Sequence, residues 1–241
     1  MPTPDATPVG RVVGLWRYPV KSMAAEMLDE APITWQGIAG DRRWAFVRDR
    51  MVQSGFPWLT LRQHPGMNRY TPTFVDPTRP ESSATVVTSP SGETLEVTDP
   101  KLAEELHPEG ARVLRQSRGA FDAFPLSVIS IQSIDAIGRR VGLELEPGRF
   151  RPNILLDLGD GEPFAEDQWV GRTLQIGGTR VRIDKRDGRC VVITTDVQTG
   201  SRSPEILEAV AKSRDGCLGV YASTVDEGTI SIGDVAALDP A

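Results

Sequence analysis

Short apolar stretches separated by glycine, proline and charged residues recur along most of this chain. In the first part they occupy residues 9–20, 33, 44–47 and 51–53. Stretches this short, broken by turn-forming residues, are typical of a meandering antiparallel sheet. With 23 glycines and 19 prolines in 241 residues, the chain has the turns that such a sheet requires. The pattern therefore predicts a mainly β (α+β) fold with a few short helices.

The first half continues as strands with one short helix. A turn at Gly92 lies within residues 84–98, between two alternating β-branched runs, and this arrangement predicts a hairpin. Residues 101–107 predict one or two helical turns, and residues 111–116 predict an arginine-containing strand. The pattern breaks at residues 117–125, which predicts the boundary between two β-rich units.

Two helices interrupt the strands of the second half. Residues 130–141 carry apolar residues at helical spacing, which predicts one buried helix face. Ser203 and Pro204 suit the cap and first position of a helix that runs to about Lys212. Strands are expected at residues 153–158, 174–176, 181–183, 190–195, 218–224 and 229–232, with a tight hairpin at residues 177–178.

Charge and composition exclude several classes of protein. A net charge of −6 and a pI near 5.1 argue against a chain-wide surface for nucleic acid. No apolar run approaches the length that spans a bilayer, and the amino terminus lacks the basic and apolar regions of a signal peptide. Two cysteines, 27 positions apart, build no disulfide framework, and two histidines are too few for a histidine-based metal centre. We therefore expect an unprocessed cytoplasmic protein that binds neither nucleic acid nor membranes.

Cys190 is the first residue that points to chemistry. It follows a charged turn and opens an apolar run, so its thiol is expected at the mouth of a strand. The neighbouring guanidinium groups of Arg186 and Arg189 favour thiolate over thiol, which creates a nucleophile or a soft metal ligand. The alternative is that Cys190 simply packs, because a free cysteine behaves as a small hydrophobe. Packing is the preferred interpretation for Cys217.

Two further clusters place cations beside polar groups. Arg151 and Asn153 precede an apolar strand and offer a guanidinium fork and an amide. Lys21 and Ser22 follow an aromatic strand and suit a phosphate, although the glycine pattern and the helix of a P-loop are absent. Either pair can equally be solvated loop residues. Taken together with Cys190, they suit a polar, anionic small molecule that takes one soft sulfur ligand.

Six motifs stand along the chain in a characteristic order. They are Trp-Arg-Tyr-Pro-Val-Lys-Ser at 16–22, Gly-Asp-Arg-Arg-Trp at 40–44, Arg-Phe-Arg-Pro-Asn-Ile at 149–154, Ala-Glu-Asp at 165–167, Arg-Cys-Val-Val-Ile-Thr-Thr-Asp at 189–196 and Gly-Thr-Ile-Ser-Ile-Gly-Asp at 228–234. In this order they resemble the MOSC family, named for the carboxy-terminal domain of molybdenum-cofactor sulfurases. The resemblance is to its two-part members in particular, the mitochondrial amidoxime-reducing components and their bacterial relatives, and it extends from about residue 9 to residue 238.

The resemblance implies a fold and a site. The family pairs an amino-terminal β-barrel-like domain, here residues 1–120, with a MOSC β-barrel domain, here residues 121–241. Cys190 matches the cysteine that supplies a thiolate to molybdenum, so it is the expected catalytic residue and metal ligand. The residues expected to bind the molybdenum cofactor (Mo-molybdopterin) are Lys21, Ser22, Arg42, Arg62, Asp122, Arg151, Asn153 and Arg189. Gly188 departs from the family pattern, which usually has a small polar residue before the Arg-Cys pair.

The implied function is that of an oxidoreductase that reduces N-hydroxylated or N-oxygenated small molecules. The sequence ends at Ala241 without a cysteine-rich ferredoxin extension, so we expect electrons from a separate ferredoxin-, flavin- or cytochrome-type protein. The alternative is a carrier of molybdenum cofactor, or of a persulfide on Cys190, without catalytic turnover. A pyridoxal-phosphate role for Lys21 is not expected, because nothing here resembles the large α/β fold of such enzymes.

Overall fold

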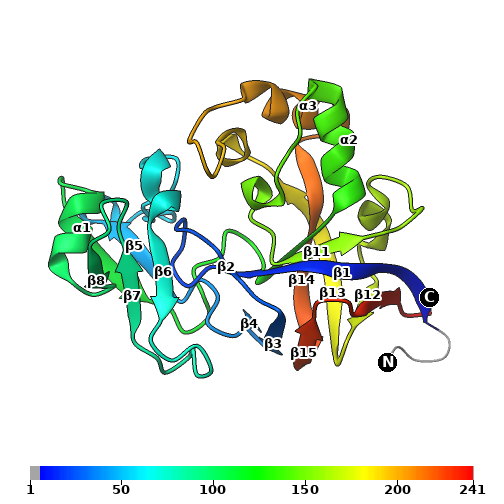
Figure 1. Cartoon of the computed structure of the whole chain (residues 1–241), viewed down its shortest axis with the longest axis horizontal. Helices are drawn as coiled ribbons and strands as arrows, with labels where there is room; N and C mark the ends of the chain where they lie inside the picture. The colour runs from blue at the N-terminus through cyan, green and yellow to red at the C-terminus, as the bar shows by residue number, and fades with distance from the viewer. Residues whose placement is uncertain (1–5, 241) are drawn as a thin grey trace.

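The computed structural model describes residues 6–240, and within them seven strands close into a barrel (Figure 1). Around the ring the strands are β1 (Thr7–Arg17), β11 (Ile154–Asp157), β10 (Leu126–Ser130), β14 (Cys217–Asp226), β13 (Thr179–Gly188), β12 (Thr173–Ile176) and β16 (Val235–Leu238). β16 pairs again with β1, so the ring closes. Neighbours run antiparallel except β10 and β11, which are parallel. Closure leaves the ring without a free edge for another chain to pair with.

Alternating side chains give the barrel an inside and an outside. On β13, Val181 is buried in the interior core and the next residue, Arg182, is exposed. All five residues of β10 are buried. Its residue Val128 joins the interior core, whereas Ile129 joins a second core formed with the helices outside the barrel. The barrel is therefore covered on the face that carries β10.

The covering helices are α2 (Ile131–Val141) and α3 (Pro204–Arg214), above the barrel in Figure 1. The Ser130 hydroxyl accepts a hydrogen bond from the Ser133 backbone amide at the start of α2. Gly142, at a φ of 68°, ends α2 in the left-handed conformation that glycine adopts without strain. The predicted helix over residues 130–141 is confirmed.

The start of α3 differs from the expectation. The helix begins at Pro204 as predicted, but the side chain of Ser203 makes no capping hydrogen bond. The backbone amide of Ser203 instead donates to the Thr194 carbonyl at 2.8 Å, which ties the start of α3 to the preceding segment. Tertiary contact, not a side-chain cap, fixes where this helix begins.

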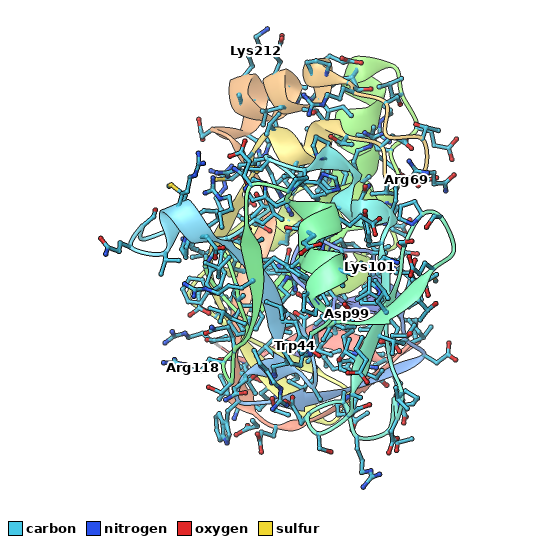
Figure 2. All side chains as sticks on the ribbon, turned by 90° about the vertical axis from the view of Figure 1, so that its left-hand side faces the viewer. Trp44, Arg69, Asp99, Lys101, Arg118 and Lys212 are labelled. Atoms are coloured by element: carbon cyan, nitrogen blue, oxygen red, sulfur yellow. The ribbon has the colours of Figure 1, made fainter. Side chains whose placement is uncertain are left out.

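The amino-terminal half is built from small sheets around a core of its own. β5 (Trp44–Arg48) pairs with β9 (Ala111–Arg115), and β6 (Thr71–Phe74), β7 (Thr85–Thr88) and β8 (Thr94–Glu96) form a three-stranded sheet. The predicted hairpin and the predicted strand at residues 111–116 are thereby confirmed. α1 (Pro100–Leu106) follows as predicted, capped by the Asp99 carboxylate, which accepts from the Lys101 amide at 2.9 Å (Figure 2).

Strands from the two halves of the sequence also pair with each other. β1 carries two barrel neighbours and, at its end, β2 (Glu26–Met27). β3 (Glu30–Thr34) pairs with β4 (Gly37–Ile38) on one side and with β15 (Gly228–Ser231) on the other. β1 and β3 are therefore held against the carboxy-terminal half by backbone hydrogen bonds. The domain boundary near residue 120 stays a prediction.

Two predicted strands are wrong. Residue 51 is the last residue of a short 3₁₀ helix, η1 (Asp49–Met51), and residues 52–53 form a turn, while residues 190–195 contain another 3₁₀ helix, η5 (Val191–Thr194). At the second site β13 ends at Gly188, and the last sheet-like bond runs from the Arg189 amide to the Gly216 carbonyl. The chain then leaves the sheet so that Ile193 packs beside α3. Packing overrides the strand preference of this β-branched run.

Three more 3₁₀ helices complete the structure, η2 (Pro65–Arg69), η3 (Pro147–Phe150) and η4 (Ala165–Trp169). Within residues 6–240, no helix combines the length and the apolar character needed to cross a bilayer. Residues 1–5, on which the expectation of an unprocessed amino terminus rests in part, lie outside the described residues.

Gly219→Ala tests the packing of β14 on β10. Gly219 has a φ of 73°, and a Cβ there would lie 2.7 Å from the Val128 carbonyl oxygen. We expect the free energy of unfolding in urea to fall by about 2 kcal/mol, because both the backbone strain and the clash are new. The control is Gly55→Ala, since a Cβ at Gly55 meets no atom within 4 Å. Equal stability of the two variants would contradict this packing.

Candidate functional site

A pocket lies where the end of the barrel meets the amino-terminal half of the chain. Eight of the nine residues predicted for the site line it, namely Lys21, Ser22, Arg42, Arg62, Asp122, Arg151, Arg189 and Cys190. The ninth, Asn153, lies behind the pocket wall and is hydrogen-bonded to Arg42. The wall also contains residues that the sequence did not single out for the site, Phe56, Thr60, Leu61, Ser127, Arg149, Phe150, Asp187, Gly188, Val192, Ile193 and Tyr221. The structure thus brings the predicted segments together in one cleft.

Three of the pocket residues have strained backbones. Ser22, Arg42 and Arg151 adopt φ values of 70°, 50° and 51°, a left-handed region that residues other than glycine rarely occupy. Hydrogen bonds from the Arg42 amide to the Tyr18 carbonyl and from the Arg151 amide to the Gly148 carbonyl hold two of these turns. Such strain persists only where the surroundings enforce it, and here it turns three polar side chains into one pocket.

Tyr18 is the aromatic support of the two arginines. The guanidinium carbons of Arg42 and Arg151 lie 4.5 and 4.3 Å from the centroid of its ring. Burial raises the pKa of Tyr18 to about 12, so it stays a neutral phenol whose hydroxyl donates to the Pro152 carbonyl at 3.0 Å. Burial, together with the charge of Arg42, lowers the pKa of Arg151 to about 10. Arg151 therefore remains a cation at neutral pH.

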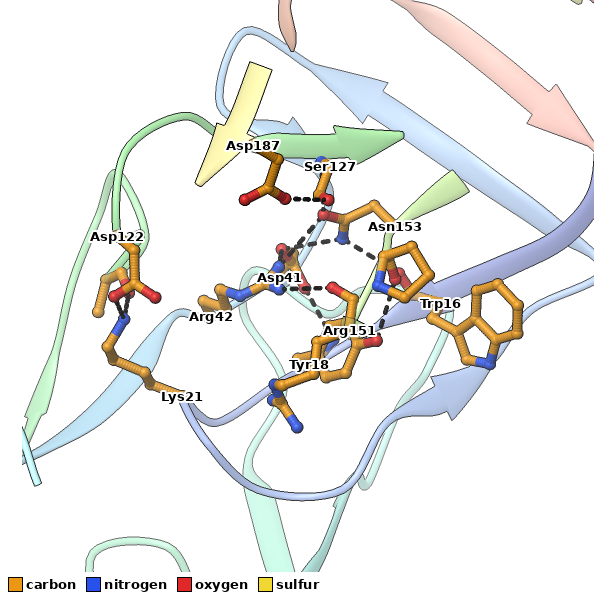
Figure 3. A network of polar contacts seen from close by, with 12 residues as sticks. Trp16, Tyr18, Lys21, Asp41, Arg42, Asp122, Ser127, Arg151, Asn153 and Asp187 are labelled. Carbon is orange, nitrogen blue, oxygen red and sulfur yellow. Dashed lines mark hydrogen bonds and ion pairs between the residues drawn. The ribbon is translucent and has the colours of Figure 1, made fainter. Parts of the chain in front are cut away.

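Asn153 joins the segments that form the floor of the pocket (Figure 3). Its side-chain oxygen accepts from Arg42 Nη1 at 3.3 Å and from the Ser127 amide at 3.2 Å. Its side-chain nitrogen donates to the Trp16 carbonyl and to Asp41 Oδ2, both at 3.2 Å. Asp41 in turn pairs with Arg42. With its side chain fully engaged, Asn153 positions Arg42 and is not itself exposed in the pocket.

Lys21 and Asp122 form a paired charge at the side of the pocket (Figure 3). The Lys21 ammonium donates to Asp122 Oδ1 at 2.6 Å and to the Ala120 carbonyl at 2.8 Å. Burial lowers the pKa of Lys21, and the Asp122 carboxylate opposes this shift. The Asp122 side chain is 65% exposed, so it is open to solvent while Lys21 is not.

Arg189 and Arg149 are held by protein acceptors. Arg189 donates to the Leu218 and Phe150 carbonyls at 2.7 and 2.8 Å, and its third nitrogen lies 3.0 Å from Asp187. Arg149 donates to the Thr194 carbonyl at 3.2 Å and to Asp196 at 2.7 Å. Both guanidinium groups thereby fasten neighbouring segments of the pocket wall.

Asp187 is a buried acid that the sequence did not single out. It is 2% exposed and accepts a hydrogen bond from Ser127 Oγ at 2.8 Å, and its carboxylate also interacts with the Tyr221 hydroxyl. Burial raises the pKa of Asp187, and the charge of Arg189 opposes the shift without cancelling it. The alternation of β13 breaks at the exposed Lys185, where the pairing with β14 shifts register, so no alternating pattern in the sequence pointed to Asp187.

Cys190 lies between β13 and η5, half-buried and in the pocket wall. A hydrogen bond with the Cys190 side chain, together with the electrostatic interaction between the two groups, raises the pKa of Arg62. Arg62, from the amino-terminal half, thus meets the sulfur from across the pocket. Gly188 leaves space nearby, since a Cβ there would meet no atom within 4 Å. The other thiol, Cys217, is half-buried and does not line the pocket.

Two family models match successive parts of the chain. A sequence model described as the MOSC domain matches residues 115–237, and one described as the MOSC N-terminal beta barrel domain matches residues 9–125. The chain is 27% identical to the mitochondrial amidoxime-reducing component 1 of Mus musculus, over 94% of this chain and 81% of that protein.

Longer proteins also contain a similar region. The chain is 27% identical to the molybdenum cofactor sulfurase of Drosophila mojavensis, over 91% of this chain and 32% of the sulfurase. It therefore spans about a third of the length of that relative. Among solved structures, the YUAD protein from Bacillus subtilis has a TM-score of 0.53 at 14% identity, over 95% of this chain and 94% of that one. At this level of identity the likeness shows the fold alone.

Asp187→Asn tests the burial of this acid. A carboxyl whose native pKa is raised above the unfolded value of about 4 contributes stability at low pH that is lost as pH rises through the native pKa. Relative to Asp187→Asn, the wild-type protein should therefore lose free energy of unfolding as pH rises from about 4 to 8. The expected loss is about 1.4 kcal/mol for each tenfold increase in the proton affinity of Asp187 between the unfolded and the native state. Exposed Asp160→Asn is the control. A wild-type gain with rising pH would show that the Arg189 ion pair dominates.

Proposed function

This chain belongs to the MOSC family, and we propose that it binds the molybdenum cofactor in the pocket and reduces N-oxygenated small molecules. The similarity to the mouse amidoxime-reducing component over most of both chains supports this proposal. The single observation that carries it is that a free thiol shares the pocket with a buried guanidinium nitrogen, Arg151 Nη2, that has no hydrogen-bond partner among the described residues.

The pocket residues fit such a cofactor chemically. Arg151 Nη2 is buried and has no hydrogen-bond partner within the described chain. A buried donor of this kind normally has a partner, and a phosphate oxygen offers a charge-assisted one. The Cys190 thiol supplies the soft sulfur that a molybdenum centre accepts. Lys21 and Arg42 line the same pocket and add positive potential for an anionic group.

We assign roles to the residues accordingly. Cys190 would be the protein ligand of the metal. The groups that would hold the organic part of the cofactor are Lys21, Ser22, Arg42, Asp122, Arg151 and Arg189. Asn153 acts through Arg42, which it positions. When bound, the cofactor supplies two-electron redox chemistry with transfer of an oxygen atom.

The overall reaction balances with an external electron donor. An N-hydroxylated substrate takes up two electrons and two protons, and its N–O bond breaks to give the reduced nitrogen compound and water. The electrons would come from a separate ferredoxin-, flavin- or cytochrome-type protein. The chain itself orients the reactants, and the cations of the pocket wall stabilise negative charge close to the Cys190 sulfur.

Replacement of Cys190 tests the proposed function. The protein is produced in a host that makes the cofactor, and benzamidoxime reduction is measured with reduced methyl viologen as electron donor. Wild type should contain nearly stoichiometric molybdenum and reduce the substrate. Cys190→Ser should lose reduction almost completely with an unchanged melting temperature, because this half-buried residue adds little to the core. Cys217→Ser is the matched control and should retain activity.

Two outcomes would contradict the proposal. Full activity of Cys190→Ser would remove the assigned metal ligand. A wild-type protein without molybdenum but with sulfane sulfur on Cys190 would indicate the alternative, a persulfide carrier.

Arg151→Gln tests the cofactor-holding role separately from the metal ligand. Loss of one charged hydrogen-bond donor to a phosphate oxygen should weaken retention of the cofactor by about tenfold to a hundredfold. Molybdenum content after gel filtration measures this retention. The control is Arg118→Gln, since Arg118 is exposed and projects away from the chain in Figure 2. Equal retention in both variants would count against Arg151 as a cofactor ligand.

A further inference from the structure

The pocket cations differ in what their donors already contact. Lys21 is engaged by Asp122 and the Ala120 carbonyl, at 2.6 and 2.8 Å. Arg189 is engaged by two carbonyls and by Asp187. These two side chains contribute positive charge to the pocket, but most of their hydrogen-bond donors already face acceptors of the protein.

Arg42 and Arg149 are likewise engaged. Arg42 pairs with Asp41 and donates to Asn153. Arg149 pairs with Asp196 at 2.7 Å and donates to the Thr194 carbonyl. Each has a carboxylate partner of its own, so neither needs an external anion to balance its charge.

Arg62 and Arg151 form no ion pair within residues 6–240. Arg151 lies on the Tyr18 ring, in the part of the pocket that we assign to the cofactor. Arg62 is exposed to solvent and contacts the Cys190 sulfur. The two guanidinium groups without an ion pair therefore lie in different parts of the pocket, one buried and one exposed beside the thiol.

Phe56 adds an apolar surface beside Arg62. Its ring centroid lies 5.9 Å from the Arg62 guanidinium carbon and 5.9 Å from the Lys21 ammonium nitrogen. The side chain is 37% exposed and lines the pocket. A half-exposed aromatic ring next to a free guanidinium suits a ligand with an apolar body and a planar anionic group.

We propose that Arg62 and Phe56 select substrates that carry a carboxylate on an aromatic or apolar body, and hold them beside the Cys190 sulfur. The guanidinium binds the carboxylate through parallel N–H donors, and the ring of Phe56 packs against the body. This inference rests on the proposed function. It moves Arg62 from the cofactor, where the family resemblance places it, to the substrate.

The first test needs no cofactor and uses Cys190 as the reporter. In a Cys217→Ser background, Cys190 is the only thiol. Its alkylation is measured with iodoacetate, which carries a carboxylate, and with iodoacetamide, its neutral analogue. In each reaction the sulfur–carbon bond forms as iodide leaves, so the ratio of the two rates cancels the thiolate fraction. Arg62→Gln should lower the iodoacetate-to-iodoacetamide ratio by about fivefold, and Arg118→Gln should leave it unchanged. An unchanged ratio in Arg62→Gln would overturn the proposal.

The second test uses the cofactor-loaded protein and two substrates, benzamidoxime and its 4-carboxylate. Arg62→Gln should lower the ratio of kcat/KM for the carboxylate to kcat/KM for benzamidoxime about tenfold, through a higher KM for the carboxylate. An equal change for both substrates, or loss of molybdenum, would overturn the proposal, since Arg62 would then act on the metal or the cofactor. A wild-type protein that reduces neither substrate would refute the proposed function, and the alkylation ratio would still decide whether Arg62 recruits a carboxylate to the sulfur.

Discussion

Closure of the barrel through β1 is the constraint on which the rest of the structure depends. β1 pairs with β16 at one edge and with β11 at the other, and both partners lie far along the chain. Its carboxyl end leads directly to Tyr18 and Lys21, which are thereby delivered to the end of the barrel where Arg151 and Arg189 arrive. The pocket is thus assembled by long-range strand pairing, and its two walls come from opposite halves of the sequence.

Several cations can gather in this pocket because most of them have a carboxylate or carbonyl partner beside them. Desolvated cations are costly unless paired and hydrogen-bonded. Four of the cationic side chains meet this requirement through carboxylates or carbonyls of their own, and the Asn153 amide holds the arrangement together from behind. Among the pocket cations, only Arg62 and Arg151 have a positive charge that no carboxylate of the described residues balances. The protein therefore separates cations that build the wall from cations that are free to meet a ligand, a division that a count of arginines does not show.

Local pattern predicted much of this molecule, and its failures have physical causes. The helical spacing of residues 130–141 and the hairpin at residues 84–98 were sufficient, because those elements are specified by their own residues. Cys190 was expected to open a strand over residues 190–195, but it follows the end of β13 and the run after it folds as a 3₁₀ helix, since packing against α3 and not local preference decides its shape. Asp187 and Tyr18 were not singled out for the site because their significance depends on partners remote in sequence. No pattern assigned separate roles to Arg62 and Arg151, since that distinction depends on which donors are already engaged.

The left-handed conformations of Ser22, Arg42 and Arg151 have a consequence for how this protein would respond to selection. Glycine would relieve the backbone strain at each position, yet it would remove the side chain that faces the pocket. A laboratory search for heat resistance alone, with no demand for a ligand, would therefore be expected to accept glycine most readily at Ser22, where few contacts are lost. Thermal stability and ligand binding therefore favour different residues at these three turns. Glycine would favour stability, whereas the side chains present favour binding.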